Sequence, residues 1–293
     1  MLKLRADRLI SVTVVHPALK LVNQYREPLI PILMYHGIRN HLSARRPYFE
    51  TNTSPKMFAA QMQFLRDNGY KTVSLNETVD CIKTDGDNQK RVAITFDDGY
   101  LDFYTDAFPT LSQHGFTATM FAVSGFTHAK AIRSADREFM TWSQLREIHR
   151  HGMEIGSHTV THPELWRLSQ RELEYELMHS KKTIEGALGE PIRSFSHPFA
   201  LPEQNKEFIR TLCTLLRKHG YENGVSTIIG TVGSDHMRYL LPRLPINSHD
   251  DANLFRAKLE GAYDWLRVAQ RVYKLWLKRP SREPKRLGQA VET

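Results

Sequence analysis

The sequence predicts an α/β protein built on a parallel sheet, either closed into a barrel or open and doubly wound. Short apolar runs alternate repeatedly with amphipathic helical stretches, which is typical of parallel strands joined by helices. The runs are apolar throughout, as strands buried on both faces are. With 293 residues, 41% of them hydrophobic, the chain can form one large catalytic domain. In either architecture, the chemistry is expected where the strands end.

Six segments carry the strand signal, because each is short, apolar and often β-branched. They are residues 30–35, 92–96, 118–123, 153–157, 193–196 and 225–229. Residues 239–245 form a further candidate strand, in which Arg243 either approaches the site or lies on the surface.

The helices between the strands have readable starts. Ser54 and Pro55 form an N-cap followed by proline at the first helical position, and Gly69 ends that helix. Thr141 and Ser169 each begin a capping-box sequence. The predicted helices cover residues 55–69, 141–152, 169–189, 203–220 and 255–278.

Charge and cysteine content narrow the class of protein. The net charge of +8 favours anionic surroundings such as acidic lipid headgroups, but no zinc-finger or RNA-recognition pattern accompanies it, so nucleic acid is not expected as a partner. Cys81 and Cys213 form neither a disulfide framework nor a thiolate zinc pattern. We find no secretory signal and no run of about 18 apolar residues. A cytoplasmic location is therefore expected, with peripheral contact at the inner membrane face.

Two adjacent carboxylates follow the strand at residues 92–96. Asp97 and Asp98 precede Gly99, and neighbouring side chains on extended backbone point in opposite directions. One acid can therefore bind a cation while the other faces a water molecule. The alternative is a simple turn, for which Asp-Asp-Gly is also a good sequence.

Two histidines four residues apart follow the strand at residues 153–157. His158 and His162 converge if the loop makes one helical turn, which Pro163 keeps short. Two imidazoles and one carboxylate from another strand form a three-ligand site with open positions, which is typical of a hydrolytic metal centre. Zinc is the default ion, and iron, cobalt or nickel also suit this ligand set.

Together with a third segment, these motifs resemble the polysaccharide deacetylase family, the NodB-homology domain of carbohydrate esterase family 4. The family is marked by T-F-D-D-G, H-[ST]-x-x-H and R-x-x-x-x-P-[YF]-G, in this order. Residues 95–99 and 158–162 match the first two motifs. Arg193, Pro198 and Phe199 match the third, but Ala200 stands where glycine is usual. The resemblance covers roughly residues 30–250 and implies a distorted (β/α) barrel.

The resemblance also implies roles for individual residues. Asp97 corresponds to the general base, with Arg193 holding it by charge, and the backbone N–H of Phe199 would stabilise the oxyanion. The implied metal ligands are Asp98, His158 and His162. The implied activity is metal-dependent removal of acetyl groups from an N-acetylated sugar in a polysaccharide, oligosaccharide or lipid-linked glycan.

The general acid is not given by a late L-x-H motif, because the sequence around His249 lacks its spacing. His36 ends the first predicted strand instead, and this layout resembles the poly-N-acetylglucosamine deacetylases, in which that motif stands at the front. We therefore predict His36 as the acid. Tyr100 either lines the sugar pocket or caps the turn. His128 and His197 are expected to lie behind the site or on the surface.

The expected organisation is an N-terminal extension over residues 1–28, a catalytic domain over 29–252, a basic aromatic helix over 253–278 and a disordered tail over 279–293. The C-terminal helix contains tryptophans, tyrosines and cations, including Tyr263, Trp265 and Arg271. It either packs on the barrel with a charged outer face or docks at an anionic membrane, where the N-terminal stretch would assist.

Two other functions compete with the deacetylase interpretation. A related metal hydrolase on the same barrel can cleave a different carbon–nitrogen bond, such as that of a small cyclic amide. A catalytically silent sugar-binding relative can keep the fold. The intact acid pair and both histidines argue against the silent relative, which has no need of Asp97.

Overall fold

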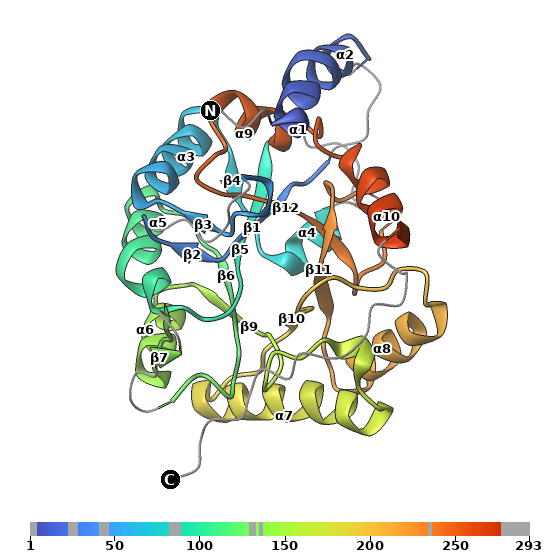
Figure 1. Ribbon diagram of the computed structural model, residues 1–293. Helices are drawn as coiled ribbons and strands as arrows, with labels where there is room; N and C mark the ends of the chain where they lie inside the picture. Colours follow the sequence, from blue (N-terminus) through green and yellow to red (C-terminus); the bar gives the residue numbers. More distant parts are fainter. Residues whose placement is uncertain are drawn as a thin grey trace.

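The computed structural model describes residues 5–22, 29–40, 47–81, 89–128, 133–134, 137–233 and 236–276. Its centre is a closed barrel of seven parallel strands, and Figure 1 shows these strands as a ring surrounded by helices. The barrel strands are β1 (Ile32–Tyr35), β5 (Arg91–Phe96), β6 (Thr119–Ala122), β9 (Glu154–Ser157), β10 (Ser194–Ser196), β11 (Asn223–Ile229) and β12 (Leu241–Pro245).

The ring closes at β1, which pairs with β12 on one side and with β5 on the other. Leu33 lies opposite Leu244 in β12 and opposite Ile94 in β5. The closed barrel is thus confirmed over the open sheet, and all seven predicted strands are present, including the late strand that carries Arg243. Short strands outside the ring are β2 (Gly37–Ile38), β3 (Asn52–Thr53), β4 (Lys71–Thr72), β7 (Arg133–Ser134) and β8 (Arg137–Glu138).

Side chains alternate between the inside and the outside of the barrel along each strand. In β5, Ile94 and Phe96 belong to the large core between the strands and the outer helices. Ala93 belongs to a separate inner cluster, and Thr95 and Asp97 share its face two and four residues further on. The inner face of β5 therefore changes from apolar to polar toward its carboxyl end.

A helix that the sequence analysis did not predict closes the amino end of the barrel. This helix, α4 (Leu75–Cys81), places Leu75 and Val79 in the inner cluster with Ile32 and Leu241, the first residues of β1 and β12. Figure 1 shows α4 within the ring of strands. With this end plugged by apolar side chains, polar chemistry is confined to the carboxyl end.

The outer helices begin at the predicted caps. Ser54 accepts a hydrogen bond from the Met57 amide, and the capping boxes of Thr141 and Ser169 are both formed. Residues 101–115 form helical turns that were not predicted. The helices of the barrel are α3 (Pro55–Asp67), α5 (Phe108–His114), α6 (Trp142–Arg150), α7 (Gln170–Leu188) and α8 (Lys206–Lys218), with shorter segments at Pro47–Phe49, Phe103–Ala107 and Leu165–Arg167.

The prediction of one C-terminal helix over residues 255–278 is wrong. The structure has two helices, α9 (Ala252–Leu259) and α10 (Leu266–Trp276), separated by turns. Gly261 has φ +79°, a left-handed conformation that ends α9. Tyr263 in the break is buried in the core, so the break supplies core packing as well as a turn. The predicted tail at 279–293 lies outside the described residues.

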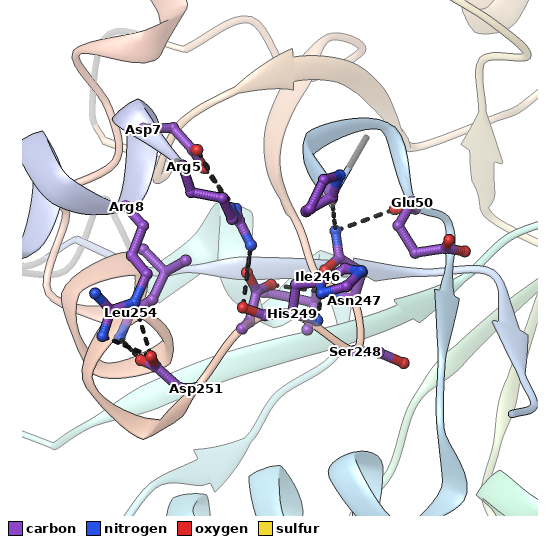
Figure 2. A network of polar contacts seen from close by, with 12 residues as sticks. Arg5, Asp7, Arg8, Glu50, Ile246, Asn247, Ser248, His249, Asp251 and Leu254 are labelled. Atoms are coloured by element: carbon purple, nitrogen blue, oxygen red, sulfur yellow. Dashed lines mark hydrogen bonds and ion pairs between the residues drawn. The ribbon is translucent and has the colours of Figure 1, made fainter. Parts of the chain in front are cut away.

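The N-terminal extension is helical and packs beside α9. It comprises α1 (Ala6–Ile10), a π-helical segment (Ser11–Val15) and α2 (His16–Val22). Figure 2 shows its polar attachment: Arg5 donates to the carbonyl of His249 at 3.1 Å and Arg8 to Asp251 at 2.7 Å. The same network continues to Asn247, whose side chain donates to the Glu50 carbonyl at 3.1 Å. Among the described residues, no helix is both long and apolar enough to cross a membrane.

Candidate active site

Most of the predicted site residues come together at the carboxyl end of the barrel, where Arg243 joins them, from four separate segments. Asp97 and Asp98 follow β5, the two histidines follow β9, and His36 follows β1. Arg243 enters from the middle of β12. Since all barrel strands are parallel, their carboxyl ends meet at one rim, which explains how residues far apart in sequence converge.

Asp98, His158 and His162 have the spacing of metal ligands. The Asp98 carboxylate oxygen Oδ1 lies 3.5 Å from His158 Nε2 and 3.4 Å from His162 Nε2, and the three ligand atoms all lie within 4.8 Å of one another. Atoms bound about 2.1 Å from a tetrahedral ion are separated by about 3.4 Å. The three side chains therefore fit one divalent ion and leave room for further ligands.

Hydrogen bonds behind these ligands fix their orientation. His158 Nδ1–H donates to the Ser196 carbonyl at 2.8 Å, so its Nε2 is the nitrogen free to bind an ion. Burial lowers the pKa of His162 to about 4, and the charge of His158 adds to this effect. The neutral imidazole of His162 therefore prevails at physiological pH, as ligation requires.

The loop that carries the two histidines is held by an acid from α7. Glu176 accepts hydrogen bonds from the amides of Val160 (2.7 Å) and Thr161 (3.0 Å), and its other oxygen accepts from the Thr161 hydroxyl at 2.7 Å. Thr159 accepts from the His162 amide at 3.0 Å. These bonds tie the loop to a rigid helix, so His162 is placed by the fold rather than by the ion alone.

Backbone strain is concentrated at the site. Within the described residues, the non-glycine positions with positive φ are Asp98 (+75°), Thr159 (+71°), His162 (+55°) and Phe199 (+56°). Each such conformation costs on the order of 1 kcal/mol or more and persists only where the surroundings impose it. Three of the four are residues that the sequence predicts for the site, and the fourth lies between the histidines.

Asp97 forms a buried ion pair with Arg243. The guanidinium donates to both carboxylate oxygens, at 2.9 and 2.7 Å, and both side chains are almost fully inaccessible to water. Ser196 donates a further hydrogen bond to Asp97 at 3.0 Å. Burial by itself raises the pKa of Asp97, but the charges of Arg243 and His158 outweigh it and lower that pKa to about 2. Asp97 is thus held ionised, as a proton acceptor must be.

The prediction that Arg193 holds Asp97 is wrong. The Arg193 side chain is 59% exposed and pairs with Glu222, with Nε to Oε1 at 3.4 Å. The physical reason is position along the strand: Arg193 precedes β10 and so lies at the amino end of the barrel, whereas Asp97 follows the carboxyl end of β5. Arg243 lies on the inner face of β12, from which its long side chain reaches Asp97.

His36 and Tyr100 lie beside the acid pair. His36 Nε2 is 3.9 Å from Asp97 Oδ2, and its side chain remains 22% exposed, so its ring is accessible from solvent. Burial raises the pKa of Tyr100, and the charge of Asp98 raises it further. The Arg137 guanidinium lies over the Tyr100 ring, 4.2 Å from its centroid. Tyr100 thus borders the proposed ion site as a neutral hydroxyl.

Of the other residues considered from the sequence, Phe199 lies at the site, whereas His197 and His128 lie away from it. The Phe199 ring lies 4.7 Å from that of His162 and is half-exposed. His197 is buried and donates from Nε2 to the Tyr239 carbonyl at 2.9 Å, which makes it a packing residue. His128 is exposed and donates to the Gly125 carbonyl.

Sequence reasoning missed Glu176, although a signal existed. Glu176 lies on the buried stripe of α7 with Leu173, Leu177 and Ile184, and an acid on an apolar stripe requires a polar partner. The same reasoning favours a buried partner for Arg243, since the neighbouring residues Leu241 and Leu244 are apolar.

Fold and site together define a parallel (β/α)-barrel protein with an acidic and imidazole-rich site at the rim of its strands. The family model for polysaccharide deacetylases matches residues 84–224. YxkH of Bacillus subtilis, whose name assigns it to the polysaccharide deacetylases, is 34% identical over 233 residues, which cover 79% of this chain and 76% of YxkH. The chain belongs to the polysaccharide deacetylase family.

Two further comparisons concern fold and substrate. The Streptococcus pyogenes deacetylase PplD, solved in complex with acetate, superimposes with a TM-score of 0.68 at 26% identity, covering 80% of this chain and 99% of PplD. The poly-β-1,6-N-acetyl-D-glucosamine N-deacetylase of Escherichia coli K12 is 31% identical over 137 residues. That alignment spans 43% of this chain but 20% of the Escherichia coli protein.

Proposed function

We propose that this protein removes acetyl groups from an N-acetylated sugar in a glycan, with a divalent metal ion held by Asp98, His158 and His162. The observation that carries the proposal is the 3.4–3.5 Å spacing of their ligand atoms beside a second, ionised acid. Zinc suits two imidazoles and one carboxylate best, and cobalt, nickel and iron are also compatible. When bound, such an ion supplies Lewis-acid polarisation of the acetyl carbonyl and acidifies a water molecule.

Asp97 acts as the general base. It is ionised, lies next to the proposed ligand Asp98, and is fixed by the two bonds from Arg243 and one from Ser196. A carboxylate held this way accepts the proton of the attacking water without having to reorient. Arg243 positions Asp97 and keeps it charged, but it is itself fully buried and does not touch the substrate.

His36 supplies the proton that the departing amine needs. It lies on the accessible side of Asp97 and is partly exposed, as a group that meets the substrate nitrogen must be. The Phe199 amide is proposed to donate to the developing oxyanion, and the left-handed backbone at Phe199 turns this peptide away from a regular strand path. Ala200 takes the place of the usual glycine without preventing that conformation, because the positive φ falls on Phe199.

An N-acetylhexosamine glycan is the proposed substrate. The support is family membership together with the alignment to the Escherichia coli poly-β-1,6-N-acetyl-D-glucosamine deacetylase. The half-exposed ring of Phe199 beside His162 offers an apolar surface on which a sugar ring can pack. A cytoplasmic location and action on a lipid-linked glycan stay predictions from the sequence.

The test is acetate release from a panel of N-acetylhexosamine oligosaccharides, comparing wild type with Asp97→Asn. The variant is isosteric, so it should keep the metal while turnover falls by about 10²–10⁴-fold, the usual contribution of a general base. Asp97→Asn as active as wild type would remove the proposed base. Activity on a cyclic amide without acetate release from any glycan would instead favour the other carbon–nitrogen hydrolase.

A further inference from the structure

The N-terminal helical segment, residues 6–21, has its polarity reversed relative to an ordinary surface helix. A helix on a soluble protein normally buries its apolar stripe and exposes polar side chains. Here the buried positions are Asp7, Ser11 and His16, all of them polar. The exposed positions are Ala6, Leu9, Ile10, Thr13, Val14, Pro17, Ala18, Lys20 and Leu21.

Each buried polar side chain of the segment forms a hydrogen bond or ion pair with a residue at or just after the end of α9. These contacts fix which side of the segment faces inward. Asp7 accepts from the Tyr263 hydroxyl at 2.7 Å, and Ser11 accepts from the Trp265 indole N–H at 3.0 Å. His16 lies 2.6 Å from a carboxylate oxygen of Glu260. Rotating the helix to bury its apolar side would break all three contacts and leave buried polar groups unpaired. The fold therefore fixes the apolar side outward.

The outward side is a continuous apolar stripe, defined here as Ala6, Leu9, Ile10, Thr13, Val14, Pro17, Ala18 and Leu21. These positions recur with the three- and four-residue spacing of one helix face. Val14 is 60% exposed and Leu21 87%. The polar exception, Thr13, donates its hydroxyl to the Leu9 carbonyl of its own helix at 2.6 Å. No side chain of the stripe therefore needs water as a hydrogen-bond partner.

The stripe favours a lipid surface over a protein partner. Figure 1 shows α1 and α2 projecting beyond the ring of strands, and the side chains of the stripe are exposed. An exposed apolar stripe one helix wide suits shallow insertion at the headgroup boundary, about 5–10 Å deep. Exposed Lys20 lies at the end of the stripe, where its ammonium can reach headgroup phosphates, and the chain carries a net charge of +8.

Two of the C-terminal aromatic residues that suggested membrane docking in the sequence contact the N-terminal segment instead. Tyr263 is buried and Trp265 is turned toward Ser11, so these aromatic side chains anchor the N-terminal segment instead of facing outward. The N-terminal segment is therefore held by Glu260, Tyr263 and Trp265, in the turns between α9 and α10.

We propose that the apolar stripe of residues 6–21 docks this protein peripherally on a membrane surface that carries anionic lipids. The polar links of this segment run to residues 249–265 and not to the proposed metal ligands, so docking does not require the ligands to take part. The proposal goes beyond deacetylation and does not depend on it.

Co-sedimentation of the full chain with phosphatidylglycerol-containing vesicles, at low ionic strength, tests the proposal. Val14→Asp places a charge in the middle of the stripe and should lower the vesicle partition coefficient at least about tenfold, from lost apolar burial and an inserted carboxylate. The matched control is Met237→Asp, which makes the same charge change at a comparably exposed residue (54%) outside the segment. Both variants should keep wild-type thermal stability and acetate release from a soluble oligosaccharide.

Four results would overturn the proposal. Failure of the wild-type chain to sediment with anionic vesicles would refute docking, and equal binding of the two variants would show that the stripe does not carry it. Binding to pure phosphatidylcholine vesicles as strong as to anionic ones would remove the role of charge. A concentration-dependent dimer that Val14→Asp abolishes, without any vesicle binding, would assign the stripe to self-association.

Discussion

Replacing Arg243 by methionine tests the account of the buried acid. The change removes the counter-charge of Asp97 while keeping an apolar side chain of similar length in the barrel interior. It also deletes the bonds that Arg243 donates to Thr95, Ser196 and the Ser226 carbonyl. Asp97 is then left as an ionised carboxylate that is shielded from water and has lost its main partner.

The expected loss of stability follows from this burial. Removing one member of a buried ion pair costs about 3–5 kcal/mol, because the other charge stays uncompensated. The depressed pKa of Asp97 points in the same direction, since it lies at about 2 instead of 3.8, which corresponds to a stabilisation on the order of 2 kcal/mol. A depressed carboxyl pKa stabilises the fold above pH 3.8, and this stabilisation is lost as the pH falls through about 2.

Urea unfolding of the chelator-treated protein measures the effect without any contribution from metal. At neutral pH, Arg243→Met should lose about 3–5 kcal/mol, and the loss should shrink as acid protonates Asp97 in the variant. Adding Asp97→Asn to Arg243→Met should recover part of the loss, because no charge is then buried. Arg193→Met is the matched control and should change the unfolding free energy by less than about 0.5 kcal/mol. Equal effects of the two arginine substitutions would refute the reasoning.

Three further predictions concern the site. Glu176→Ala, which frees the loop between the histidines, should weaken zinc binding about 10–100-fold in a chelator competition assay, with Glu176→Gln in between; unchanged affinity would mean that the loop needs no support. His36→Gln should lower kcat/KM for acetate release about 100-fold or more while metal content stays at wild type; retained activity would require another proton donor. Dialysis against a chelator should abolish acetate release, and added zinc should restore it; full activity of the metal-free protein would contradict the proposed chemistry.

The parts of the site that are local in sequence could be predicted. Asp97 and Asp98 directly follow an apolar strand, and the two histidines directly follow another. Parallel strands deliver their carboxyl ends to one rim, so the convergence of these residues follows from the strand assignment. The position of His36 at this rim could be predicted for the same reason, because it directly follows β1.

Long-range pairing could not be predicted in the same way. The sequence motif offered Arg193 as the partner of Asp97, but an arginine before a strand lies at the opposite end of the barrel. Choosing Arg243 requires knowing that β12 adjoins β1 and that its inner face points at Asp97, which depends on barrel closure. The break between the two C-terminal helices has a local signal that the single-helix prediction did not use, since Gly261 is a residue type at which helices commonly end and has a left-handed backbone here.

The orientation of the N-terminal segment shows a further limit of pattern reading. A single helix with one apolar and one polar side can be docked either way, and hydrophobicity alone favours burying the apolar side. Here Tyr263, Trp265 and Glu260 offer polar partners to the other side. Only these tertiary contacts reveal which side of the segment is buried.

Metal content per chain, measured by mass spectrometry after zinc loading and removal of free ion, tests the central claim most directly. Wild type and Asp97→Asn should each retain one zinc ion per chain, whereas His158→Ala/His162→Ala should retain almost none, because it leaves a single carboxylate ligand. A full equivalent of zinc in the double-histidine variant would place the ion elsewhere and contradict the assignment of Asp98, His158 and His162 as its ligands.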